Sequence, residues 1–160
     1  MPIPQFGVLE APNETTPLSF DGLATVDFKL IFPKLPMVNM FLHTMDIPTI
    51  NVSPVQVATR FVTAKQIGEK ISYQPFTITF LVDKSLYTYT EIYNWMKRMT
   101  VSGTAIGDTD NPYMMIGSKT ITFIDAFPVS LDRLSFKAND DNTVYIEGAA
   151  TFEFDYIEIK

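Results

Sequence analysis

The spacing of apolar side chains changes abruptly within residues 71–99. In the first part, apolar residues alternate with threonines, which is the two-residue period of a β-strand with one buried face. These residues are Phe76, Ile78 and Phe80. In the second part the spacing becomes three and four, the period of an amphipathic helix. Its apolar stripe is Leu86, Tyr89, Ile92, Tyr93 and Met96. The pattern predicts a strand and then a helix over about 85–99, begun by Asp83, by Ser85 or by a Thr88–Glu91 capping box.

Strands and turns are predicted for the rest of the chain, because apolar and polar residues alternate over most of it. We expect strands over residues 24–32, 55–62, 70–80, 120–127, 131–138 and 143–158. Pro128 should separate two of them, and Gly148 should interrupt the last one as a bulge. Residues 101–115 and 139–142 are expected to form a surface loop and a tight turn. The predicted fold is mainly β: an antiparallel sandwich or barrel with one flanking α-helix and a long hairpin.

The predicted hairpin joins strands 55–62 and 70–80, and its turn is assigned to residues 63–69, which are polar and contain Gly68. Long strands with free edges tend to pair with another chain. The hairpin tip is therefore a candidate contact with a neighbouring subunit. Its residues are Thr63, Ala64, Lys65, Gln66, Ile67, Gly68 and Glu69.

The chain divides into two parts by composition. Residues 1–22 contain Pro2, Pro4, Pro12 and Pro17 and are expected to form an extended N-terminal arm. Residues 23–160 are expected to form a single β domain, since 160 residues with 46% hydrophobic content suffice for one core.

Charge and cysteine content exclude several classes of site. There are no cysteines, so thiolate metal sites and cysteine nucleophiles are excluded. The net charge of −6 argues against tight phosphate binding, which needs clustered Lys and Arg. Residues 1–20 lack the pattern of a signal peptide, and no stretch is apolar enough to predict a membrane-spanning helix.

Candidate catalytic and metal-binding residues are few. His43 is the only histidine, and no partner for a triad or a metal site is specified around it. Residues 108–111 (Asp-Thr-Asp-Asn) superficially resemble a calcium loop but lack the required glycine and closing glutamate. Phosphate-loop, dinucleotide-binding and hydrolase motifs do not occur. We therefore expect no enzyme activity, no metal and no cofactor.

Several motifs, taken in order, resemble the tail tube protein family of contractile-tailed bacteriophages. The strand Phe76–Phe80 is followed by Asp83 and by a helix containing Tyr93-Asn94-Trp95-Met96. Upstream lies Asp46-Ile47-Pro48, and downstream lie Asp125-Ala126-Phe127-Pro128-Val129-Ser130-Leu131 and the closing strand Ala150–Tyr156. The resemblance covers about residues 24–158. The inner tubes of contractile injection systems share this fold.

The resemblance implies a structural protein of the virion. Subunits would form hexameric rings that stack into a tube inside a sheath, on a baseplate, after assembly in the host cytoplasm. DNA would pass through the β-lined channel without specific binding, and an acidic lumen would keep it from adhering. Candidate lumen residues are Asp27, Glu153 and Asp155.

Two alternatives remain open. Residues 1–22 do not look like the usual start of a major tube subunit, which leaves room for a baseplate tube initiator or a terminator ring of the same fold. An alternative of another class is a small ligand-binding β-barrel, which would need an apolar cavity with a few convergent polar groups.

Overall fold

Two four-stranded antiparallel sheets and two helices form the body of the protein in a computed structural model, which describes residues 28–101, 107–137 and 145–160. Sheet 1 has the order β1 (Phe28–Ile31), β8 (Tyr113–Ile116), β9 (Lys119–Ile124), β12 (Tyr156–Ile159). Sheet 2 has the order β10 (Phe127–Leu131), β11 (Glu147–Glu153), β7 (Phe76–Leu81), β2 (Leu42–Met45). The prediction of a mainly β, antiparallel sandwich with a flanking helix is confirmed.

The core lies between the two sheets and is rich in phenylalanine. Alternate residues of β7 are fully buried, as the strand period requires, and so are the inward-facing residues of β11. The ring of Phe76 lies 4.7 Å from Phe123 of sheet 1 and stacks at 5.4 Å on Phe152 of sheet 2. These aromatic contacts bury large apolar areas and hold the two sheets face to face.

Helix α2 (Tyr87–Val101) confirms the predicted helix, shifted by two residues. It buries Thr88, Ile92 and Trp95. Asp83 begins it, because its Oδ1 accepts hydrogen bonds from the backbone N–H and the hydroxyl of Thr88 at 3.0 and 3.1 Å. The Thr88–Glu91 capping box is wrong, since the Glu91 carboxylate accepts hydrogen bonds from another helix.

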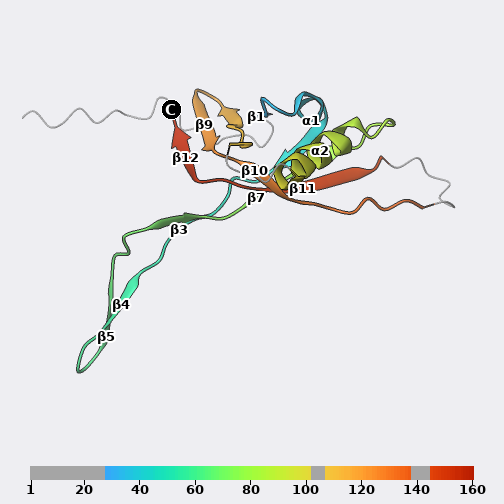
Figure 1. Cartoon of the computed structure of the whole chain (residues 1–160). Helices are drawn as coiled ribbons and strands as arrows, with labels where there is room; N and C mark the ends of the chain where they lie inside the picture. Colours follow the sequence, from blue (N-terminus) through green and yellow to red (C-terminus); the bar gives the residue numbers. More distant parts are fainter. Residues whose placement is uncertain (1–27, 102–106, 138–144) are drawn as a thin grey trace, which may run out of the picture.

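That other helix is α1 (Pro36–Phe41), and the expectation of a single helix is corrected by it. The backbone N–H groups of Met37 and Val38 donate to Glu91 Oε2 at 3.1 and 3.3 Å. A carboxylate from a neighbouring helix thus satisfies donors that the first turn of α1 leaves open. Burial raises the pKa of Glu91 above its ordinary value, against the lowering effect of these two hydrogen bonds. Figure 1 shows both helices on the same side of sheet 2 as sheet 1.

Several predicted boundaries are wrong. The expected loop 101–115 ends in strand β8, and the expected strand 131–138 is instead β10, which runs through Pro128. Proline is tolerated there because β10 is an edge strand with a register shift after Pro128. Gly148 does not interrupt β11, which pairs with β7 without a shift; the chain leaves sheet 2 only at Phe154 and Asp155. The expected turn at 139–142 lies outside the described residues.

The long hairpin is a two-stranded ribbon that extends away from the body (Figure 1). Its base pairs β3 (Ile50–Val52) with β6 (Ile71–Tyr73), and its outer part pairs β4 (Val55–Ala58) with β5 (Thr63–Gln66). The turn is therefore at Thr59–Val62, where the Thr59 N–H donates to the Val62 carbonyl at 3.1 Å. The prediction of a turn at 63–69 is wrong, because residues 63–66 are the returning strand.

Gly68 explains the misplaced turn. It lies halfway along the ribbon, where a Cβ atom would come within 1.7 Å of the Ser53 carbonyl oxygen. Only glycine allows the two backbones to approach so closely. The glycine that suggested a turn in the sequence marks the joint between the two halves of the ribbon.

Candidate assembly surfaces

The outer face of sheet 2 is lined by small and polar side chains. It carries the residues of β7 and β11 that alternate with the buried ones: Thr77, Thr79, Ala149, Thr151 and Glu153. The hydroxyls of Thr77 and Thr151 are hydrogen bonded at 3.0 Å, and that of Thr79 is bonded to Thr44 of β2. Among the described elements none covers this face, since sheet 1 and the helices lie on the other side (Figure 1).

Charged groups lie at both ends of this face. Glu147 begins β11 and its Oε1 is 2.8 Å from His43 Nδ1 of β2, with both side chains about half exposed. Glu153 ends β11 and is exposed. Of the predicted lumen residues, Glu153 lies on this face, Asp155 is exposed in the link to sheet 1, and Asp27 lies outside the described residues. Their role in a lumen stays a prediction.

The two edges of sheet 2 form a second surface. Strands β10 and β2 stand at opposite ends of the sheet order, and each has one neighbouring strand. Within the described chain, the further edge of β10 is met only by the single bridge of Asp110 with Ala126. Unpaired backbone groups along such edges are sites where another strand can add.

The ribbon is the third surface, and its two faces differ. Directly paired residues share a face, so Ile50, Val52, Ile71 and Tyr73 lie together at the base. In the outer part Val55, Val57 and Ala64 share a face, whereas Gln56, Lys65 and Thr63 lie on the other. Tyr73 packs on Phe154 of the body at 5.6 Å.

Large apolar side chains are exposed along the ribbon. The tip residue Phe61 and the joint residue Ile67 are each 91% exposed, and Val62 is 68% exposed. Three more residues of the ribbon's apolar face are about half exposed: Ile50, Val52 and Val55. An apolar surface of this extent on a protruding element marks a contact with another protein.

The predicted interface residues are distributed over the returning side of this ribbon. Thr63, Ala64, Lys65 and Gln66 form β5, and Ile67, Gly68 and Glu69 lie at the joint. Their role in a subunit contact stays a prediction. Sequence reasoning missed the tip at Thr59–Val62, although Phe61 between polar residues was the available signal.

The expected calcium-like loop forms a structural tether. Asp108 Oδ1 is 2.9 Å from Lys34 Nζ, and its Oδ2 is 3.5 Å from Arg98 Nε. The Asp108 backbone carbonyl accepts a 2.8 Å hydrogen bond from the indole N–H of Trp95. The hydrogen bond from Lys34, followed by the charges of Lys34 and Arg98, lowers the pKa of Asp108. The described residues contain no group of side chains arranged to hold a metal ion.

The described helices are all too short or too polar to cross a membrane. The groove described below lies between α2 and Leu131, outside the space between the two sheets.

Comparison with known proteins establishes the fold. Neither a protein-family model nor a curated protein sequence matches the chain. Its architecture is that of tube-related components of contractile injection systems, so the resemblance inferred from the sequence is confirmed at the level of the fold.

Three solved structures show this likeness. A chain of the PVC sheath/tube terminator in the extended state has a TM-score of 0.66 and 15% identity, covering 88% of this chain and 97% of that one. A chain of the PVC sheath-tube complex gives 0.64 and 14%, covering 87% and 91%. A chain of the anti-feeding prophage cap, a tube-terminating cap, gives 0.65 and 15%, covering 94% and 99%.

Proposed function

We propose that this protein is a non-enzymatic structural subunit that forms the rings of a tail-type tube. The observation that carries the proposal is the relation between the two free edges of sheet 2. Four antiparallel strands alternate in direction, so β10 and β2 run in opposite directions. When copies are arranged around an axis, β2 of one copy therefore lies antiparallel to β10 of the next, and the sheet continues without a break. Such a head-to-tail contact closes into a ring.

In this ring the uncovered face of sheet 2 lines the channel. Small side chains there leave the passage open, and the hydrogen-bonded threonines present a polar wall. Glu153 adds negative charge, which repels the phosphates of a passing DNA. Six copies per ring are supported by the family resemblance and by the similar baseplate structure of the anti-feeding prophage, which was determined as 6-fold symmetrised (TM-score 0.52, 12% identity).

The ribbon is proposed to contact a neighbouring copy through its apolar face. Exposed apolar residues on a protruding element lose free energy in water and regain it when a second subunit covers them. In a mature particle, the rings would stack within a sheath on a baseplate, as part of a phage-type tail assembled in the host cytoplasm. The predicted arm 1–22 lies outside the described residues and stays a prediction.

A terminator or initiator ring of the same fold is the second candidate, because the similar structures include a sheath/tube terminator and a tube-terminating cap. The edge pairing and the channel face apply equally to a single ring and to stacked rings. The two functions differ in whether assembly continues along the axis.

Negative-stain electron microscopy of the purified protein across a concentration series tests the proposal. Hollow tubes support a tube subunit, and isolated rings support a terminator or initiator. Val55→Asp on the apolar face of the ribbon should abolish stacking, whereas Gln56→Asp on its other face adds the same charge and should leave stacking intact. A monomer at every concentration would argue against ring formation, and equal effects of the two substitutions would argue against the ribbon contact.

A further inference from the structure

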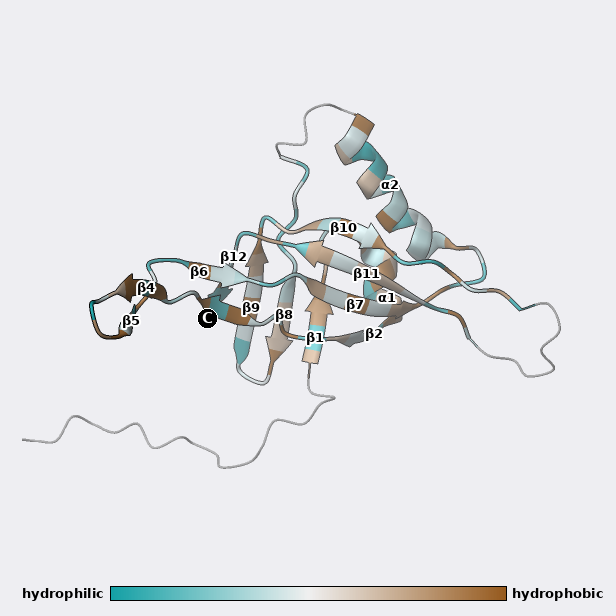
Figure 2. Cartoon of the chain, turned by 90° about the horizontal axis from the view of Figure 1, so that it is seen from below, coloured by the Kyte–Doolittle hydropathy of each residue, from teal (hydrophilic) through white to brown (hydrophobic). Residues whose placement is uncertain are grey.

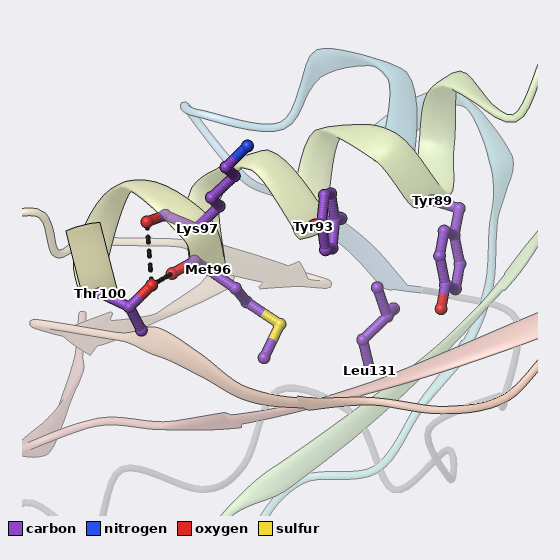
Figure 3. Close-up of a pocket in the computed structure, with 6 residues that line it drawn as sticks. All are labelled: Tyr89, Tyr93, Met96, Lys97, Thr100 and Leu131. Atoms are coloured by element: carbon purple, nitrogen blue, oxygen red, sulfur yellow. Dashed lines mark hydrogen bonds between the residues drawn. The ribbon is translucent and has the colours of Figure 1, made fainter.

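A groove opens beside the β10 edge of sheet 2. Figure 2 shows α2 reaching past β10, on the side away from β11. The groove lies between the helix and this strand and is lined by Tyr89, Tyr93, Met96, Lys97, Thr100 and Leu131. Figure 3 shows the aromatic rings and the methionine on the same side as Leu131, whereas the amino group of Lys97 points away. Tyr93 is 52% exposed. The groove is thus mainly apolar and open to solvent.

A matching side chain stands at the opposite edge of the same sheet. Helix α1 leads directly into β2, the other edge strand, and lies on the same side of sheet 2 as α2 (Figure 1). Its Val38 is fully buried, and Met40 is 74% exposed. Two residues rotate the chain by about 200° around a helix, so Met40 points away from the core that Val38 contacts. A methionine so exposed on a six-residue helix contributes little to the fold of the single chain.

We propose that Met40 of one copy inserts into the α2 groove of the next copy in the ring. The inference rests on the proposed function, because continuing sheet 2 from β10 into the next copy's β2 carries the next copy's α1 toward the overhanging α2. The groove and the side chain then belong to one heterologous contact, with the groove at one edge and the methionine at the other. The occupant is thus a second copy of this chain.

The chemistry of the two surfaces agrees with this contact. Methionine is unbranched and flexible, so it fills irregular apolar gaps, and its sulfur packs favourably on aromatic rings such as those of Tyr89 and Tyr93. Backbone pairing of two edges carries little sequence information by itself. A side chain from α1 that must enter a groove on α2 would fix which edge pairs with which, and in what register.

Cysteine cross-linking tests the contact directly, because the chain contains no cysteine. The variants Met40→Cys and Tyr93→Cys are purified separately, mixed under conditions in which the unsubstituted chain assembles, and oxidised. A disulfide-linked dimer should form in the mixture and not in either variant alone. Mixing two single-cysteine variants excludes a bond within one chain.

A second measurement compares charges on two exposed methionines. Met40→Asp should raise the concentration needed for ring formation about tenfold or more, which corresponds to about 1.4 kcal/mol or more. Met115→Asp, on sheet 1 and 45% exposed in the single chain, adds the same charge away from the groove and should leave that concentration unchanged. Rings without the cross-link, or with equal effects of the two substitutions, would overturn the groove contact and leave the proposed function standing. No assembly of the unsubstituted chain would overturn both.

Discussion

Gly148 provides a quantitative test of the packing in sheet 2. It lies within β11, directly opposite Phe80 of β7. A Cβ atom built on Gly148 would lie 2.8 Å from both Cε2 and Cζ of Phe80 and 3.4 Å from Cγ2 of Val82. Phe80 is fully buried, so its ring cannot turn into solvent. The glycine makes room for this ring in a strand that otherwise pairs regularly.

The expected cost of Gly148→Ala follows from these distances. Carbon atoms in contact prefer separations of about 3.5–4.0 Å, so the Phe80 ring or the backbone of β11 must move by about 1 Å. Inserting a methyl group into a packed core typically costs about 1–3 kcal/mol. This exceeds the gain of up to about 1 kcal/mol that replacing a strand glycine by alanine can bring. We therefore expect a net loss in the free energy of unfolding of about 1–2 kcal/mol.

The assay is equilibrium unfolding in urea, followed by the fluorescence of Trp95. Trp95 is the only tryptophan and is 1% exposed, so its emission reports loss of the core. Ala149→Ser, one residue away on the opposite face of β11, serves as the control and should change the free energy of unfolding by less than about 0.5 kcal/mol.

A double-mutant cycle identifies the clash as the cause. Leucine at position 80 lacks the two ring atoms that the new methyl group would meet. Phe80→Leu alone destabilises by leaving a cavity, but in the Gly148→Ala background the methyl group fills part of that cavity. The double variant should therefore lose less than the sum of the single losses, by about 0.5 kcal/mol or more. Additive losses, or a stabilising Gly148→Ala, would refute the packing argument.

Three further predictions concern α2 and its tether. Asp83→Ala removes the acceptor of the Thr88 backbone N–H at 3.0 Å, so the melting temperature at pH 7 should fall by a few degrees in circular dichroism. The pKa of Asp108 is lowered from its ordinary value of 3.8, chiefly by the hydrogen bond from Lys34, so its stabilising effect is present above pH 3.8 and is lost as the pH falls through the lower folded-state value. Asp108→Asn should therefore flatten the acid side of the stability curve, and an unchanged curve would contradict the tether. Trp95→Phe leaves the Asp108 carbonyl without its indole donor, and urea unfolding followed by circular dichroism should show a loss of about 1–3 kcal/mol.

Periodicity in the sequence was sufficient where one element has one buried face. The alternation from Phe76 to Phe80 and the helical spacing up to Met96 both reflect contacts with a single core, and both elements form as expected. Asp83 was among the predicted caps because it precedes the apolar stripe, and it does cap α2. The order of motifs also indicated the fold, which the solved structures confirm.

Elements that depend on tertiary contacts could not be found this way. Helix α1 has only six residues and no side-chain cap of its own, so its first turn relies on Glu91, more than 50 positions away in the sequence. Pro128 was read as a strand break because its edge position was unknown. Gly68 was read as a turn, whereas the close approach of Ser53 is its reason.

The candidate surfaces show the same limit from another side. Phe61 and Ile67 look like core residues in the sequence, because hydrophobic side chains are usually buried, yet both are among the most exposed in the described chain. Nothing within one copy explains that exposure. Their exposure is explained when a second chain is added, and the same holds for Met40 and for the free edges of sheet 2. A sequence selected for assembly satisfies its packing in the complex, so the apparent misplacements in a single chain are the residues that identify where the next copy binds.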